Sequence, residues 1–298
     1  MPDGPRRGGP PPELVRAAWR LGRGLPRVAA GVAVEAGYTA AHLALYPWGL
    51  RRAPVPAAAA GGLADLSPAQ RGLASRDVEA AGTPILLVHG IGDNHTIFAL
   101  LQRQLRRRGF RTVSTHDYGL LTRDVRAAAR QLGEAVEALC ASTGHERLHV
   151  VGHSLGGLIA RYHVQRQGGD ARVDTLVTLG TPHGGTVLAR ALPGLPLLRQ
   201  LAPGSDVIAE LAEPAPGCRT RFLAVRTDLD HLVVPGRNAA LEHPDLDVRN
   251  LAVRGVGHLS LTGDARVARE IAATLAELTG GERGRAPTTG ADPREKRT

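Results

Sequence analysis

The stretch LHVVGHSLGGLIA, residues 148–160, decides how the rest of the chain is interpreted. Four strand-like residues lead into Gly152, His153 and Ser154, and two further glycines follow before a segment with helical character. A strand rarely ends in a cluster of glycines unless the backbone bends sharply there or another segment approaches it closely. The pattern therefore predicts a tight strand-to-helix turn with a serine at its apex.

The composition is that of a globular chain with a strong arginine bias. The 298 residues are 43% hydrophobic but only 3% aromatic, so Leu, Val, Ile and Ala must form the core. The net charge of +9 comes from arginine, since Lys296 is the only lysine. Basic residues are not interleaved with aromatic ones and no nucleic-acid-binding motif is present, which argues against a nucleic-acid partner.

The two cysteines, Cys140 and Cys218, are too few and too far apart for a disulfide scaffold or a metal site. One disulfide in an exported protein and two reduced thiols both agree with the sequence. The pairing of the thiols and the oligomeric state stay open at this point.

The ends of the chain differ in composition from its middle. Residues 1–27 begin with a Pro-, Gly- and Arg-rich stretch and are predicted to be a disordered basic N-terminus. Residues 281–298 are predicted to be a solvated tail for the same reason. Between them we expect an apolar helical segment over residues 28–60 and a folded domain over residues 61–280.

The apolar stretch 28–50 raises the question of a membrane. It is long enough to cross a bilayer at about 1.5 Å per residue, and arginines flank both ends. It carries Glu35 and His42 near its middle, however, where an acidic group costs roughly 2–3 kcal/mol. A membrane span or signal anchor, a helix lying on a membrane, and a helix packed on the domain all fit. The location therefore stays open between membrane-associated and cytoplasmic, with export a further option.

From residue 84 onward, short β-rich runs alternate with helical stretches. The runs with strand character are 84–88, 111–115, 148–151, 173–179, 221–226 and 248–253. The stretches with apolar residues at helical spacing are 95–108, 123–142 and 264–278. Strands that alternate with helices predict an α/β fold, with a mostly parallel central sheet covered by helices on both faces.

In such a fold, residues 152–156 form a G-x-S-x-G motif between a strand and a helix, the context in which a serine serves as a nucleophile. Ser154 is therefore a candidate nucleophile. The alternative is a glycine-rich turn with an incidental serine. A serine hydroxyl is a weak nucleophile without a neighbouring base, so a histidine oriented by a carboxylate should lie downstream.

The best candidate for the base is His258, in a glycine-flanked loop after the last predicted strand. Two acids follow the preceding strand, and Asp230 is preferred over Asp228 because the apolar residues after it would shield it from water. His183 precedes both acids, which breaks the expected order of serine, acid, histidine. His153, beside the serine, is expected to pack against or orient the site.

The segment HGIGDN, residues 89–94, directly follows the first predicted strand. Its backbone N–H groups can point toward the carboxyl end of the sheet, where a substrate oxygen would develop negative charge. The candidate donors are the N–H of Ile91 and the N–H of Leu155, just after the serine. The alternative is a plain tight turn that uses Gly90 and Gly92 for their backbone freedom.

Five segments in order, VHGIGDN, VGHSLGG, LGTPHGG, DLDHLVVP and GVGHLSLT, resemble α/β-hydrolases of the bacterial lipase and esterase type, and the small Bacillus lipases most closely. The resemblance covers residues 83–278. It implies the catalytic triad Ser154, Asp230 and His258, with an oxyanion hole at Ile91 and Leu155. It also implies a serine hydrolase that cleaves carboxylic esters of lipids or other acyl compounds, with no cofactor or metal.

The resemblance leaves the substrate open. Gly-His-Ser-Leu-Gly occurs in esterases, lipases and thioesterases alike, so a thioesterase, an acyltransferase and a non-catalytic binding protein are the alternatives. Residues 184–216 form an apolar, Leu- and Pro-rich insertion that the smallest lipases lack. A cap or lid over an acyl pocket and ordinary helices that cover the core are equally compatible with it.

Overall fold

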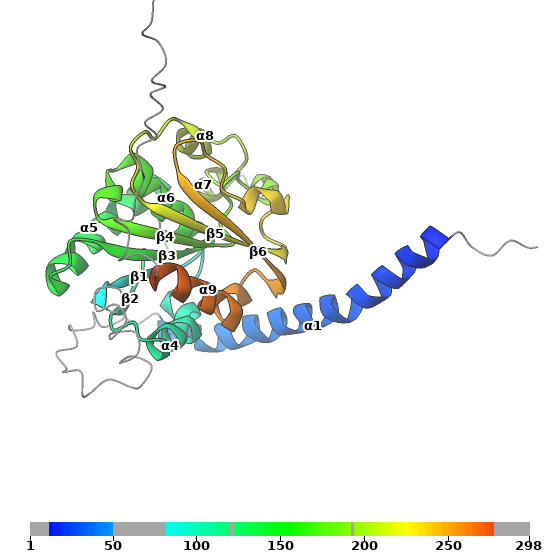
Figure 1. Ribbon diagram of the computed structural model, residues 1–298. Coiled ribbons are helices and arrows are strands. Elements are labelled where there is room, and N and C mark those ends of the chain that lie inside the picture. The colour runs from blue at the N-terminus through cyan, green and yellow to red at the C-terminus, as the bar shows by residue number, and fades with distance from the viewer. Residues whose placement is uncertain (1–11, 50–81, 120–121, 192–193, 277–298) are drawn as a thin grey trace, which may run out of the picture.

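The computed structural model describes residues 12–49, 82–119, 122–191 and 194–276 (Figure 1). The strands are β1 (Ile85–Val88), β2 (Val113–His116), β3 (Leu148–His153), β4 (Val173–Leu179), β5 (Arg221–Leu229) and β6 (Asp247–Gly257). The α-helices are α1 (Pro12–Gly49), α4 (Ala99–Arg107), α5 (Val125–Thr143), α6 (Leu155–Arg166), α7 (Pro196–Arg199), α8 (Asp206–Ala212) and α9 (Ala265–Ala276). The short 3-10 helices are η2 (His95–Phe98), η3 (Gly169–Ala171), η4 (Val187–Ala191), η5 (Gly236–Ala239) and η6 (Ser260–Thr262).

The six strands form one sheet in the order β2-β1-β3-β4-β5-β6, and every neighbouring pair is parallel. Val88 of β1 pairs with Gly152 of β3, and Leu229 of β5 pairs with Gly257 of β6. Each of these strands ends at or just after these pairs, so the loops that follow them lie at one edge of the sheet. In open parallel sheets this carboxyl edge is where ligands bind.

Helices cover both faces of the sheet, and this confirms the predicted α/β fold class (Figure 1). Leu86 and Val88 point into a core layer formed with α5, α6 and α8. Ile85 and Leu87 point into the opposite layer, formed with α4 and α9. Because successive side chains of a strand point to opposite faces, a strand buried on both sides is an uninterrupted apolar run such as ILLV.

Strand β3 is longer than predicted. The glycine at 152 suggested that the strand ends at residue 151, but Gly152 and His153 still pair with Thr178 and Leu179 of β4. The bend comes one residue later, at Ser154. Glycine is used here for close packing against the next helix and not to end the strand.

Helix α1 begins at Pro12, so the prediction of disorder for residues 12–27 is wrong. Proline is well tolerated in the first turn of a helix, and the Leu, Ala and Arg residues that follow are good helix formers. The start of α1 extends away from the domain (Figure 1), and its later part packs against β6 and η2. Val28–Pro47 has a mean hydropathy of 1.3 over a membrane-length window, enough by length and composition to cross a membrane. The predicted boundary at 60 and the tail 281–298 lie outside the described residues.

The insertion 184–216 contributes mainly to the core. Val207 and Leu211 of α8 are fully buried in the layer formed with α5 and α6. Glu210 of the same helix bonds to Arg126 and lies 2.5 Å from the hydroxyl of Tyr162. This part of the insertion therefore covers the core. Its earlier part exposes three apolar side chains, those of Val187, Leu188 and Leu195.

Both cysteines are free thiols in the structure. Cys140 is buried at the end of α5 and Cys218 is half-buried. Burial raises the pKa of each thiol above its ordinary value, which disfavours the reactive thiolate. The cysteines therefore have the character of packing residues.

Candidate active site

The backbone at Ser154 has a conformation that side chains rarely adopt. With φ 52° and ψ −121°, Ser154 is the one non-glycine residue with positive φ among the described residues. Such a conformation costs about 1–3 kcal/mol and persists only where the surroundings enforce it. Ser154 also stands at the N-cap position of α6, where a serine side chain normally bonds to the helix, yet its hydroxyl makes no capping bond. The hydroxyl is therefore free for another role.

Close packing around two glycines enforces this turn. A Cβ atom on Gly156 would overlap the backbone carbonyls at the end of β1, and one on Gly157 would overlap the side chain of Thr181. The N–H of Ser154 donates to the carbonyl of Leu179 in β4 at 2.8 Å. Helix α6 thus starts in direct contact with its neighbouring strands, and the serine is held at the carboxyl edge of the sheet.

A buried carboxylate–histidine pair lies at the same edge. Nδ1 of His258, after β6, lies 2.8 Å from Oδ2 of Asp230, after β5, and each side chain is only 1% exposed. The other carboxylate oxygen of Asp230 accepts the N–H groups of Leu232 and Val233, both at 2.9 Å. The carboxylate is therefore fixed in place by the turn that follows it.

Three hydrogen bonds determine the charge of Asp230. Burial alone would raise the pKa of this carboxyl, but the hydrogen bond and charge of His258 and the two backbone N–H donors together lower it. Asp230 is therefore ionised and can only accept, so Nδ1 of His258 carries the proton. The other ring nitrogen, Nε2, is then an acceptor. It is buried and has no hydrogen-bond partner in the part of the chain that the structure describes.

Two adjacent residues at the end of β4, Leu179 and Gly180, contact the serine and the Asp230–His258 pair. A Cβ atom on Gly180 would lie 3.0 Å from Nδ1 of His258 and 3.2 Å from Oδ2 of Asp230. The preceding residue, Leu179, bonds to the N–H of Ser154. His153, beside the serine, has its Nε2 atom 3.1 Å from the carbonyl oxygen of His258. The three predicted triad residues therefore lie beside the adjacent residues Leu179 and Gly180, and His153 contacts the histidine loop.

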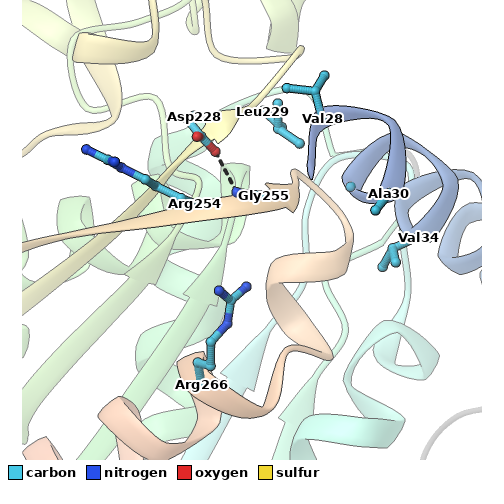
Figure 2. Close-up of a pocket in the computed structure, with 9 residues that line it drawn as sticks. Val28, Ala30, Val34, Asp228, Leu229, Arg254, Gly255 and Arg266 are labelled. Carbon is cyan, nitrogen blue, oxygen red and sulfur yellow. Dashed lines mark hydrogen bonds between the residues drawn. The ribbon is translucent and has the colours of Figure 1, made fainter. Parts of the chain in front are cut away.

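The structure pairs Asp230 with His258 and places Asp228 elsewhere. Figure 2 shows Asp228 directed at the backbone of Gly255, whose N–H donates to its carboxylate at 2.8 Å. This acid lines a surface pocket of about 610 Å³ between α1 and the β5–β6 edge, together with Arg254 and Arg266. Asp228 thus stabilises a bend in β6, and Asp230 is the acid within reach of the imidazole.

The predicted oxyanion loop lies against the serine. A Cβ atom on Gly90 would be 3.1 Å from the Cβ of Ser154. The hydroxyl of Tyr118 lies 2.7 Å from the carbonyl oxygen of Gly90 and fixes that peptide group. Because the N–H of a trans peptide points opposite to its carbonyl, the N–H of Ile91 is directed away from Tyr118. Leu155 begins helix α6, so its N–H has no acceptor within the helix.

His183 takes no part in this cluster. It is buried, and its Nε2 atom lies 2.9 Å from the hydroxyl of Thr178. Burial and the nearby Arg161 lower its pKa well below the ordinary value, so it is a neutral packing residue. Among the residues that the structure describes, no group of three or more His, Cys, Asp or Glu side chains is arranged to hold a metal ion.

Two groups of residues at the site were not predicted. Tyr118 follows β2, and its only signal in the sequence is an aromatic residue just after a strand that borders the oxyanion loop. Glu35 and His42 of α1 also reach the active-site loops. Their signal was visible as two ionisable residues, seven apart and hence on one helix face, within an apolar stretch.

Comparisons with known proteins concern the fold and the type of enzyme. Residues 83–207 match the family model for the alpha/beta hydrolase fold. A triacylglycerol lipase from Burkholderia plantarii is 28% identical over 149 residues, which are 48% of this chain and 40% of that protein. The chain thus corresponds to less than half the length of this curated relative.

Two solved structures are similar in fold at low sequence identity. The mature Bacillus licheniformis lipase BlEst2 has a TM-score of 0.55 and 16% identity, covering 66% of this chain and 92% of that one. A structure from the work on LipS and LipT, two metagenome-derived lipolytic enzymes, has a TM-score of 0.52 and 16% identity, covering 65% and 94%. The chain therefore has the α/β-hydrolase fold and resembles the bacterial lipase and esterase type within it, as the sequence predicts.

Proposed function

We propose that the chain is a serine hydrolase that cleaves carboxylic ester bonds of lipids or other acyl esters. The observation that carries the proposal is the strained, uncapped Ser154 beside a buried Asp230–His258 pair whose free ring nitrogen has no partner. A serine with only a structural role would cap its helix, which Ser154 does not do. Since Nδ1 of His258 is bonded to Asp230, Nε2 is the nitrogen that can act as the base.

The mechanism follows from the atoms at the site. Oγ of Ser154 attacks the ester carbonyl while Nε2 of His258 takes its proton, and Asp230 stabilises the resulting imidazolium. The N–H groups of Ile91 and Leu155 stabilise the negative oxygen of the tetrahedral intermediate, and one such donor typically lowers the barrier by about 2.7–4 kcal/mol. As the ester C–O bond breaks, His258 gives its proton to the leaving alcohol. Water then repeats the sequence and releases the acid from the acyl-enzyme.

Two observations support a lipid or other apolar acyl substrate. The relatives of known name are lipases and lipolytic enzymes. In addition, exposed apolar side chains flank the site in the oxyanion loop, the acid loop and the insertion. They are Ile91, Leu232, Val187 and Leu188, each about 40% exposed.

We also propose that α1 binds a membrane surface. All the polar side chains in residues 28–47 (Glu35, Tyr38, Thr39, His42 and Tyr46) are buried or half-buried. Every exposed residue of this segment is Ala, Val, Leu, Gly or Pro. The most exposed are Leu43 at 64% and Val32 at 59%. A long helix with one wholly apolar exposed side fits a lipid surface.

The contacts of α1 favour a helix that lies in the membrane interface over one that spans the bilayer. Polar contacts with the domain run from Glu35 to Tyr46, along about 17 Å of helix. A spanning position would carry the attached catalytic loops into hydrocarbon, where exposed backbone groups find no hydrogen-bond partners. A helix in the interface plane keeps those loops at the aqueous boundary.

The catalytic proposal is tested with the full chain on p-nitrophenyl butyrate. We expect hydrolysis by the wild type and a loss of about 10³-fold or more in kcat for Ser154→Ala. Ser142→Ala is the matched control, an exposed serine at the end of α5 whose hydroxyl donates to the carbonyl of Leu139. Equal rates for the wild type and Ser154→Ala would reject a serine nucleophile. A profile of ester chain lengths then defines the acyl specificity.

The membrane proposal is tested by flotation with vesicles that contain an anionic phospholipid, since arginines precede the apolar segment. We expect the wild type to float and the double variant Val32→Gln, Leu43→Gln to remain in the soluble fraction. Leu195→Gln, which changes an apolar residue of the insertion that is 53% exposed, should float like the wild type. Flotation of the α1 double variant at the wild-type level would contradict the proposal.

A further inference from the structure

We infer that Glu35 is a positioning residue for His258, so that helix α1 is part of the active site as well as a membrane-binding element. The inference rests on the proposed function, because it assigns Glu35 a role in the same reaction. It goes beyond that proposal in requiring a carboxylate located more than 200 residues before the base in the sequence.

The contacts of Glu35 are confined to the residues around His258. Its two carboxylate oxygens accept the N–H groups of Leu259 at 2.7 Å and Ser260 at 2.9 Å. On the other side of the histidine, a Cβ atom on Gly257 would overlap the Glu35 carboxylate. The carboxylate therefore lies against the residue before His258 and bonds to the two residues after it.

These bonds satisfy two backbone donors that the loop does not satisfy by itself. Within the loop, the hydroxyl of Ser260 accepts the N–H of Gly257, and the hydroxyl of Thr262 donates to the carbonyl of Leu259. Strand β6 ends at Gly257 and η6 begins at Ser260, so the N–H groups of Leu259 and Ser260 stand at the start of a short helix and lack helical partners. A carboxylate is an acceptor for both, and charge-assisted bonds of this kind are about twice as strong as neutral ones. With His153 bonded to the carbonyl of His258, the base is fixed from both sides.

Other residues of α1 fix the helix itself. The hydroxyl of Tyr38 donates to the carbonyl of Ile97 at 2.9 Å, and Nε2 of His42 lies 2.8 Å from a carboxylate oxygen of Asp93 in the oxyanion loop. One helical turn further on, the side chain of Asn94 donates to the carbonyl of Tyr46 at 3.2 Å. Docking of α1 therefore does not depend on Glu35 alone. Contacts of Tyr38, His42 and Tyr46 hold the helix in the position that places Glu35 beside the histidine loop.

The experiment uses the full chain with Glu35→Ala and Glu35→Gln. Glu270→Gln is the matched control, since it removes a carboxylate from an exposed pair with Arg249. A misplaced base slows the chemical step with little change in substrate binding, and displacements of this kind can cost about 10²-fold. We expect kcat to fall about 100-fold in Glu35→Ala and about 10-fold in Glu35→Gln, with KM within about twofold of the wild type. Glu270→Gln should match the wild type.

Formate provides a readout that a purely structural role would not change. Glu35→Ala leaves a space beside two unpaired N–H groups, and formate can supply the missing carboxylate there. We expect formate to restore part of kcat in Glu35→Ala, and chloride at the same ionic strength to have no effect. Unchanged kcat in both Glu35 variants, a change confined to KM, or a loss of kcat that formate does not relieve would overturn the inference.

Amide hydrogen exchange separates this inference from the proposed function. The N–H groups of Leu259 and Ser260 should be protected in the wild type and in Glu270→Gln, and should exchange at least about tenfold faster in Glu35→Ala. This readout does not require ester hydrolysis. An inactive wild type with protected amides would reject the proposed reaction but keep the contact, whereas equal exchange in the wild type and Glu35→Ala would overturn the role of Glu35.

Discussion

The turn at Ser154 and the contact between α1 and the catalytic loops hold the same edge of the sheet in different ways. The turn is built from backbone atoms in close contact, within a few residues of the serine and the ends of β1 and β4. The α1 contact is built from side-chain hydrogen bonds between segments 224 residues apart, such as Glu35 and Leu259. The steric contacts around the turn permit almost no substitution. The polar contacts of α1 refine the position of loops that the sheet already places.

The largest effect on kcat is expected at Asp230, the acid of the Asp230–His258 pair, where both charge and geometry matter. Asp230→Asn keeps the shape of the side chain but removes the charge that stabilises the imidazolium and can orient the wrong tautomer, so kcat should fall about 10⁴-fold. Asp228→Asn, which changes only the bond to Gly255, should stay within about threefold of the wild type. Steady-state kinetics on a soluble ester checks both. The reverse order of effects would assign the acid to Asp228.

The next test concerns the two glycines of the turn. An added methyl on Gly156 meets fixed backbone carbonyls, and one on Gly157 meets a threonine side chain. Overpacking of this kind typically costs about 1–3 kcal/mol, and we expect more for Gly156→Ala than for Gly157→Ala. Adding Thr181→Ala to Gly157→Ala should recover part of the free energy of unfolding, as measured by urea titration. Equal costs, or no recovery, would mean that the close packing does not hold the turn.

A smaller effect is expected where a polar contact supports the oxyanion loop. Tyr118→Phe removes the hydroxyl that fixes the Gly90 peptide while keeping the ring stacked on His89. The net worth of such a bond is about 1 kcal/mol, so kcat should fall about fivefold to tenfold while KM stays unchanged. Tyr162→Phe serves as the control, because it removes a hydroxyl of α6 that bonds to Glu210 of α8. A loss confined to KM would argue against a role in stabilising the oxyanion.

A separate prediction concerns stability against pH and three histidines that are buried or half-buried in the sheet. Burial lowers the pKa of His116, His149 and His153 to about 4 in the folded protein. The unfolded chain, with an ordinary pKa near 6.5, therefore binds more protons between pH 6.5 and 4, and stability must fall on acidification. Each histidine contributes about 2 kcal/mol between pH 7 and pH 5, enough in total to lower the melting temperature by more than about 10 °C. The lowered pKa of Asp230 matters only at more acidic pH.

Thermal melts across this range check the effect, with His149→Gln as the matched variant. The variant should have a shallower dependence on pH, because it lacks one of the three groups that titrate on unfolding. Parallel curves for the wild type and His149→Gln would contradict the assignment of a neutral, buried histidine at this position.

The contrast between the two regions also explains what the sequence could predict. The parallel sheet and the turn at Ser154 were predictable because each depends on a local pattern. Asp230 could be preferred over Asp228 because the apolar residues after it follow directly in the chain. The end of β3 was misplaced because glycine there serves packing against Gly157, which depends on how α6 sits on the sheet.

The contacts of α1 could not be predicted because they join segments that are distant in the sequence. Glu35 and His42 stood out as polar residues in an apolar stretch, but their partners Leu259 and Asp93 carry no matching local signal. The helical start at Pro12 was missed because the arginine-rich composition of the first residues outweighed their helix propensity. For the contacts of α1 the tertiary context decides, whereas the helical start at Pro12 agrees with the local helix propensity.

The most direct test of the central claim is to map the covalent adduct formed with an alkyl fluorophosphonate, which reacts only with an activated serine. We expect a single modification on the peptide that contains Ser154, absent in Ser154→Ala, and labelling at least about 10²-fold slower in His258→Gln. Labelling at another residue, or wild-type labelling rates in His258→Gln, would contradict a serine nucleophile activated by the buried Asp230–His258 pair.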